Sequence, residues 1–364
     1  MKSFGKVDYV NGTLRITAYA NFFGGNATSL LVVDPTGRPI RIDDKTQTYN
    51  LEMGHSRMVR SRHLVSYGGN FRHSGFNVSL APDGKSRNEG GAYFQDEVRL
   101  SEMFRGVVGA RIDRFDFLPG VILSPRTTLL VKPVPGQTLR LSYNRAYMAP
   151  PMLANYEQLA IMGRLDLGLI QSQFAGNYFE FPVHIVGNRD LQRQSLDAYE
   201  LGYIANVAGG RARLSGAAYI NDSRGDINFG QSDSYTSSKP PPGWPLPASV
   251  LDALIAANAF GPGNGLPSVR SPRNLGKVRN RGIELSGDVR VNRYLSGYAN
   301  YSWQACPQPR DFDISLLNLP PTHRFNASLG FDYGRYLGNV SVGYAASAYF
   351  NDVISVAYSG STKA

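Results

Sequence analysis

The sequence of 364 residues contains a single cysteine, Cys306, and lacks any apolar run of the length that a membrane-spanning helix needs. One cysteine excludes an internal disulfide and a metal site ligated by cysteines alone. A transmembrane helix needs about 20 consecutive apolar residues, so we expect none. The start, Met1–Gly5, leads into no apolar segment, so we also expect no signal peptide.

Charged residues are also scarce. They make up 18% of the chain, against roughly 25% in soluble domains. Lys and Arg outnumber Asp and Glu by 38 to 28, which gives a formal net charge of +10. A basic protein can bind nucleic acid. However, these basic residues are scattered and accompany no nucleic-acid-binding motif, so we expect no nucleic-acid partner. A soluble basic β-protein that binds nucleic acid is therefore the weakest alternative.

What the sequence has instead is a strict alternation of apolar and polar residues. In Arg324–Tyr333, every second residue is apolar, and Arg324, Asn326 and Asp332 fall on the other face. A period of two over ten residues indicates a strand with one apolar and one wet face. By this alternation we expect about fourteen strands, at residues 3–10, 13–23, 47–57, 63–74, 90–100, 104–114, 125–133, 137–147, 195–207, 210–222, 278–291, 294–305, 323–333 and 336–349.

The strands and their connections predict an all-β fold, a transmembrane antiparallel β-barrel. Strands of about ten residues suit a tilted crossing of a bilayer roughly 30 Å thick. Short turns such as Asn11-Gly12 and Gly209-Gly210 alternate with long loops, expected at residues 24–46, 148–193, 223–276 and 306–321. Short turns at one end and long loops at the other are typical of outer-membrane barrels.

Two local predictions accompany this fold. Asp96 falls on the apolar face with Phe94 and Val98, and a charge in mid-bilayer costs up to a few kcal/mol. We therefore expect a bulge there or a position near the rim. In the third loop, residues 248–260 predict a short helix that Ser249 caps and Gly261 stops.

Five short motifs, spanning residues 93–326, resemble the TonB-dependent outer-membrane receptors. Tyr93–Glu97 is similar to the family's Y-x-Q-D-E strand, and Asn280–Leu285 to its N-x-G-[IV]-E-L strand. The other three resemblances are at Leu139–Pro150, Asn188–Tyr203 and Leu319–Asn326. This sequence departs from the family at four positions. In Leu139–Pro150, Met148 replaces an arginine. In Asn188–Tyr203, the family's Pro, Pro and Glu are replaced by Arg189, Arg193 and Gln194.

The resemblance implies a partial barrel. Such receptors have about 22 strands around a plugged lumen, so the fourteen expected here are about two thirds of one barrel. No plug domain, energy-coupling box or signal peptide is recognisable before the first expected strand, and Ser359–Ala364 does not end on an aromatic residue. We therefore expect residues 1–364 to be a barrel fragment, truncated at both ends.

The resemblance also implies function. It implies TonB-energised uptake of a scarce small molecule (a siderophore, vitamin, metal complex or oligosaccharide) across the bacterial outer membrane. The implied partners are outer-membrane lipid, the receptor's own plug domain and a TonB-type energy-coupling protein. We expect no enzymatic activity, catalytic residue, metal or cofactor, because no phosphate loop, nucleophile elbow or spaced ligand pair is present. A passive porin-like or adhesin-like barrel without energy coupling is the main alternative.

Two groups of residues are candidates for ligand contact. The first comprises polar residues expected to face the lumen, where solvation and cross-strand pairing would also explain them: Arg126, Arg140, Asn144, Glu284, Asp288, Arg290 and Arg324. The second is an aromatic cluster in the second long loop, expected to be exposed: Tyr156, Phe174, Tyr178, Phe179, Phe181 and His184. Exposed aromatics are common recognition anchors, although a loop that packs on its neighbours is an equal alternative.

Overall fold

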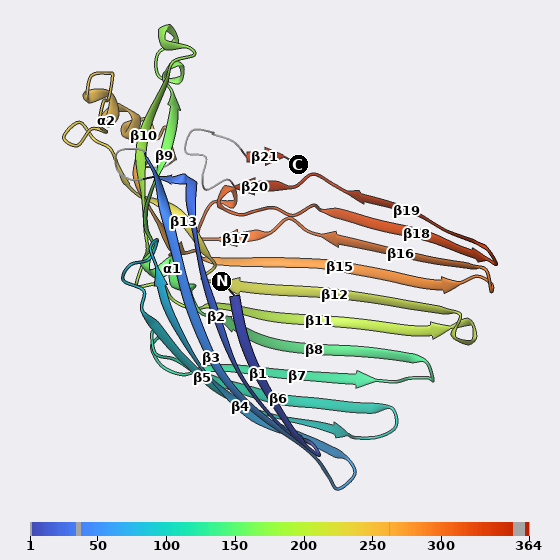
Figure 1. Cartoon of the computed structure of the whole chain (residues 1–364). Coiled ribbons are helices and arrows are strands. Elements are labelled where there is room, and N and C mark those ends of the chain that lie inside the picture. Colours follow the sequence, from blue (N-terminus) through green and yellow to red (C-terminus); the bar gives the residue numbers. More distant parts are fainter. Residues whose placement is uncertain (1, 34–37, 262, 352–360, 364) are drawn as a thin grey trace.

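The computed structural model in Figure 1 is a curved antiparallel sheet and describes residues 2–33, 38–261, 263–351 and 361–363. The main ladder consists, in spatial order, of β1 (Lys2–Asn11), β2 (Leu14–Val33), β3 (Pro39–Val59), β4 (His63–Val78), β5 (Ser86–Arg99), β6 (Phe104–Phe115), β7 (Ile122–Val131), β8 (Gln137–Met148), β11 (Gln194–Val207), β12 (Ala212–Arg224), β15 (Lys277–Arg290), β16 (Leu295–Gln304), β18 (His323–Tyr333) and β19 (Tyr336–Ala345).

All fourteen predicted strands are confirmed. The largest difference concerns the first long loop, expected at residues 24–46, most of which is strand. The register of β2 and β3 continues from Phe22↔Gln47 to Thr28↔Arg41, so both strands project beyond their predicted ends. Residues 34–37 of the expected loop lie outside the described residues. The alternation there is weaker, and cross-strand pairing rather than pattern lengthens the strands.

The described sheet is not closed. Each inner strand pairs on both sides, whereas β1 and β19 do not pair with each other among the described residues. Figure 1 shows these two strands at opposite edges of the curved sheet. A separate small pair, β20 (Tyr349–Asn351) with β21 (Ser361–Lys363), lies at the C-terminal side. The C-terminal residues 352–360 and 364, which include half of the predicted chain end Ser359–Ala364, lie outside the described residues.

Short turns and long connections lie at opposite ends of the strands, as predicted. Gly12, Gly209 and Gly210 adopt φ values of 58°, 63° and 84° in two of the short turns. Glycine has no Cβ to clash in this left-handed region, so these turns can be tight. Arg60 and Ser61 make the β3–β4 turn with φ values of 49° and 55° despite carrying side chains.

Asp96 lies near the rim, the second of the two positions predicted for it. It pairs with Val65 and Val108 without a register shift in β5, so no bulge accommodates it. Its carboxylate is 2.7 Å from Nδ1 of His63, the first residue after the Arg60–Arg62 turn. Asp96 therefore has a polar partner, His63, because it lies near the short-turn end of the sheet rather than in the middle of the bilayer.

Two long loops fold together into a small domain at the other end of the sheet, which we call the loop module. It contains β9 (Gln158–Asp166), β10 (Tyr178–Val186), β13 (Ile227–Ser234), β14 (Pro267–Asn274) and α2 (Ser249–Ala256). β10 pairs with β9 and, in parallel, with β14, which ties one loop to the other. Phe181, Leu251 and Leu266 are fully buried in its core. The loop module thus has a hydrophobic core of its own.

The remaining elements are short. They are α1 (Met152–Tyr156), β17 (Gln308–Arg310) and single 3-10 turns at Leu167–Leu169, Ser172–Phe174, Ala208–Gly210 and Ile314–Leu316. The predicted helix in the third loop is confirmed as α2, but Ala248 occupies the N-cap position without a side-chain bond, so the predicted Ser249 cap is wrong. None of the helices in the described residues combines the length and apolar composition needed to span a membrane.

Glu157 joins α1 to the loop module and has an unusual environment. The residue is 8% exposed, and its Oε1 has no hydrogen-bond partner among the described residues. Burial raises the pKa of this carboxyl from 4.5 to about 7, because desolvation disfavours the charged form. The junction between α1 and β9 therefore contains a carboxyl that is neutral in mildly acidic solution.

Replacing Phe181 by alanine should open the core of the loop module. Large-to-small core substitutions of phenylalanine cost about 3–5 kcal/mol, and Phe181 is 0% exposed. We expect limited proteolysis to cut the 149–193 loop at least ten times faster in Phe181→Ala. The control is Leu169→Ala in the same loop, since Leu169 is 76% exposed. Equal cleavage of the two variants would contradict this core.

Glu157 should make the loop module less stable as pH rises. Because its folded pKa lies above its ordinary value, stability is full below about pH 4.5 and is lost progressively up to about pH 7. Glu157→Gln keeps the volume but cannot ionise. Hydrogen exchange of residues 152–166, corrected for the intrinsic effect of pH, should show protection falling over this window in the parent protein only. A pH-dependent loss of equal size in the variant would refute the assignment.

Candidate functional site

The register of the strands divides the sheet into an apolar and a polar face. Across β5, β6, β7 and β8, directly paired residues include Tyr93↔Arg111, Gly109↔Arg126 and Arg126↔Asn144. Paired residues share a face, so these polar side chains form one continuous wall. The intervening residues, such as Phe94, Val108 and Ile112, are large, apolar and exposed on the other face. The polar wall is the surface on which most of the sequence-predicted polar candidates should be sought.

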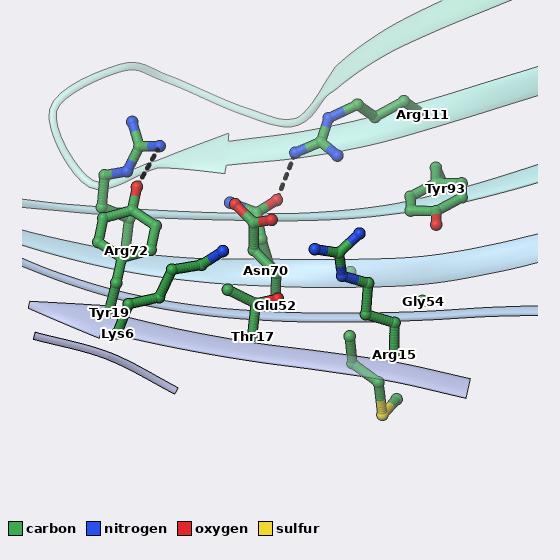
Figure 2. Close-up of a pocket in the computed structure, with 12 residues that line it drawn as sticks. Lys6, Arg15, Thr17, Tyr19, Glu52, Gly54, Asn70, Arg72, Tyr93 and Arg111 are labelled. Atoms are coloured by element: carbon green, nitrogen blue, oxygen red, sulfur yellow. Dashed lines mark hydrogen bonds between the residues drawn. The ribbon is translucent and has the colours of Figure 1, made fainter. Parts of the chain in front are cut away.

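The first part of the wall is a hollow of about 660 Å³ on β1–β6. Figure 2 shows Lys6, Arg15 and Arg72 gathered around Glu52 and Asn70. Arg72 donates to the Tyr19 hydroxyl at 3.3 Å. Cross-strand alternation brings these side chains together from neighbouring strands.

Arg111 is the most extensively bonded cation of this hollow. Its guanidinium donates to both carboxylate oxygens of Asp113 and to Oδ1 of Asn70, at 2.5–2.9 Å. Gly91 makes room for this pair, since a Cβ at that position would stand 2.1 Å from Asp113 Oδ1 and 2.5 Å from Arg111 Nη2. Gly91 therefore has a packing role.

Charges on this part of the wall largely neutralise one another. Four ion pairs cross or follow the strands: Lys6–Asp8 at 2.7 Å, Arg15–Asp8 at 3.5 Å, Arg72–Glu89 at 2.9 Å and Arg111–Asp113 at 2.6 Å. Glu52 accepts from Asn50 at 2.9 Å. Each of the four cations that line this hollow thus pairs with a carboxylate on the same wall, so the hollow is not strongly basic.

The second part of the wall, on β8–β18, brings several predicted residues together. Arg140, Glu284 and Arg324 line one hollow of about 740 Å³ with Ser286 and Asn300. Asn144 and Glu284 line an adjoining hollow of about 620 Å³, which extends to Leu317 in the 305–322 connection. Arg140 pairs with Glu200 across the strands. This arrangement offers hydrogen-bond donors and acceptors to a ligand from several strands.

The other predicted polar residues lie on the same face but outside these two hollows. Arg126 pairs in register with Asn144. Asp288 and Arg290 lie farther along β15, opposite Tyr298 and Ser296, towards the short-turn end. The structure places all seven predicted polar residues on one wall, whereas their contact with a ligand stays a prediction.

The predicted aromatic cluster is split by the structure. The expectation that Phe181 is exposed is wrong, because its ring is fully buried between Phe179 and Tyr235. Phe174 and Phe179 are partly buried against the same core. These three aromatics stabilise the loop module, which agrees with the alternative of a loop that packs on its neighbours.

Tyr178 and His184 are the exposed members of the cluster, and Tyr156 is half-buried. The Arg164 guanidinium lies 3.8 Å from the centre of the Tyr178 ring. A stacked arginine and tyrosine present a flat, cationic and aromatic surface to solvent. Tyr156 has a similar but looser neighbour in Arg189, at 5.2 Å.

Sequence reasoning missed three residues that matter here. Trp244 packs edge-on against Phe179 at 5.2 Å, and Tyr235 donates to the Pro182 carbonyl at 2.7 Å. Both come from the other long loop, so no local pattern pointed to them. The third, Arg164, could have been found, because the hairpin β9–β10 places it opposite Glu180.

The arrangement is suited to binding. Nowhere in the described part of the chain do three or more His, Cys, Asp or Glu side chains converge as metal ligands would. The polar wall and the exposed face of the loop module offer hydrogen bonds, charges and aromatic surface, which are the means of recognising a solute.

Comparison with known proteins agrees with this geometry. Residues 3–363 match the family described as TonB dependent receptor-like, beta-barrel. A search of curated proteins finds no match. Solved structures are similar in fold, each over 96% of this chain. They include a mutant ferric enterobactin receptor (PfeA) from Pseudomonas aeruginosa (13% identity, TM-score 0.67), the siderophore receptor PirA from Acinetobacter baumannii (16%, 0.64) and the FrpB iron transporter from Neisseria meningitidis (14%, 0.59).

The chain spans about half the length of these three structures, at 49%, 49% and 50% of each. Identities this low establish likeness of fold alone. The family match, in contrast, covers nearly the whole chain, and this family comprises receptors and transporters of the bacterial outer membrane rather than enzymes. The chain therefore belongs to the TonB-dependent receptor-like β-barrel family.

Proposed function

We propose that this chain is the barrel portion of an outer-membrane receptor that takes up a ferric siderophore with energy from a TonB-type protein. The observation that carries the proposal is the family match over residues 3–363, joined to a sheet whose one face is a continuous polar wall. A polar lumen beneath long outer loops is how such barrels combine capture and passage of a solute.

The choice of ligand class rests on the similar structures and on the exposed loop module. Of the three similar proteins, one is described as a ferric enterobactin receptor, one as a siderophore receptor and one as an iron transporter. Arg164 and Tyr178 offer a cation and an aromatic face at the long-loop end of the sheet. Ferric siderophores with anionic or aromatic chelating groups would suit both, through charge and stacking. We assign Tyr178, Arg164 and His184 to ligand capture. We assign the polar-wall residues to the path that the ligand would then follow; these are Arg140, Asn144, Glu284 and Arg324.

The proposal also requires partners. A plug domain in the complete receptor would lie against the polar wall and block free diffusion. Ion pairs such as Arg111–Asp113 leave that wall polar yet nearly neutral, which suits a surface that must release a plug during transport. The TonB-type protein would act on the plug from the short-turn end. A passive porin-like or adhesin-like barrel would need neither partner.

One uptake experiment tests the proposal on the complete receptor that contains this chain. Cells with iron-55 loaded on a catecholate siderophore should accumulate iron, and loss of the energy-coupling protein should abolish accumulation. Tyr178→Ala combined with Arg164→Ala should weaken siderophore binding by about tenfold, as removal of an exposed anchor does. Tyr336→Ala, an aromatic at the opposite end that is 65% exposed, is the matched control.

The outcomes separate the alternatives. Uptake that persists without the energy-coupling protein would support the passive barrel and contradict this function. If uptake requires the energy-coupling protein but the double variant binds the siderophore as tightly as wild type, the transport function would stand. The assignment of Tyr178 and Arg164 to ligand capture would then be wrong.

A further inference from the structure

A band of charged residues crosses the outer, apolar face of the sheet at its long-loop end. Two successive register rows carry it. The upper row runs Tyr147, Ser195, Arg224, Lys277 and Arg310, and the next runs Arg145, Asp197, Asp222, Arg279 and Gln308. Paired residues share a face, and this face is the one opposite Asn144 and Asn280 of the polar wall. We call these two rows, together with Arg281, the rim band.

The rows below the rim band turn aromatic and then apolar. The next row holds Tyr143, Tyr199, Ile220 and Arg281, and the one after it Leu141, Leu201, Ala218, Ile283 and Trp303. Tyr199, Leu201 and Ile283 are 48%, 45% and 41% exposed. A tyrosine row above an aliphatic band marks the interface between hydrocarbon and headgroups. The rim band therefore lies at headgroup depth.

Part of the rim band is internally paired. Arg145 binds Asp197 through two hydrogen bonds of 2.6 and 3.0 Å, and Tyr143 donates to the same carboxylate at 2.9 Å. Arg279 holds Asp222 through two bonds of 2.7 Å. Asp197 is 4% exposed, so these pairs form a fixed platform.

Three cations on this platform are left over. Lys277, Arg281 and Arg310 are exposed, and no carboxylate lies within 4 Å of their charged groups in the described residues. Lys277 stands between Arg224 and Arg310 in one row, with Arg281 two rows below on the same strand. Such a concentration of like charge on the wall of a barrel needs counter-ions.

We propose that the rim band binds the phosphate-bearing headgroup of an outer-leaflet glycolipid, with Lys277, Arg281 and Arg310 as its phosphate contacts. The three cations favour an anionic ligand, because opposite charges attract. The exposed Tyr199 and Leu201 lie directly next to the band, so the ligand should also carry acyl chains that contact this apolar surface. Arg donates in a planar fork that matches phosphate, whereas Lys supplies a mobile point charge. The inference rests on the proposed placement in the outer membrane but not on the transported ligand.

The test uses the complete receptor, purified in a non-ionic detergent, and bisphosphorylated lipid A as the probe. Native mass spectrometry would measure the dissociation constant for wild type and for Lys277→Gln/Arg281→Gln/Arg310→Gln. We expect a rise of about 150-fold, since each of the three cations near an anionic lipid surface contributes about 1 kcal/mol. The matched control removes three exposed cations at the short-turn end, Arg211→Gln/Arg293→Gln/Arg335→Gln, and should change affinity less than about twofold.

Three further measurements keep the test decisive. Lys277→Arg/Arg281→Lys/Arg310→Lys keeps the charges and should retain binding. If the neutral triple variant does not fold, Lys277→Gln alone should weaken binding about fivefold. Inorganic phosphate at the concentration of lipid A should not displace it. Equal affinity in the neutral and control variants, or displacement by inorganic phosphate, would overturn the proposal, and neither outcome bears on siderophore uptake.

Discussion

The constraint on which this structure depends is the need to pair every backbone hydrogen-bonding group of a membrane strand with a neighbouring strand. Water is absent from the bilayer, so the ladder from β1 to β19 must continue without interruption. Once that register is set, the period of two sends successive side chains to opposite faces. Glu284 then lies on the wet face and Leu285 on the apolar face because they are adjacent on β15. Both surfaces of the molecule follow from this single alternation.

Charged residues are distributed differently on the two faces of the sheet. On the polar wall, Arg72 and Arg111 form ion pairs with Glu89 and Asp113, so charges on this face are mostly balanced. On the outer face, charge is confined to the ends of the strands, as with Asp96 beside His63 at the short-turn end and the rim band at the other. The basic excess of the sequence is thus partly a property of the outer rim.

Much of the fold could be predicted from the sequence, because alternation is a local signal that survives without tertiary information. All fourteen strands, the turn glycines and the common face of Arg140, Glu284 and Arg324 follow from it. The loop module could not be predicted. Phe181 and Trp244 lie in different loops, and Phe181 becomes buried only when one loop packs on the other. The extra length of β2 and β3 likewise comes from cross-strand pairing.

The most direct test of the account is the accessibility of adjacent positions on β15 in outer-membrane vesicles. In a receptor with Cys306→Ser, spin labels at Leu285→Cys and at Glu284→Cys would be compared for collisions with oxygen and with a water-soluble nickel chelate. The label at 285 should collide chiefly with oxygen, as in hydrocarbon, whereas the label at 284 should not. Equal oxygen accessibility at both positions, or the reverse pattern, would contradict the assignment of the two faces.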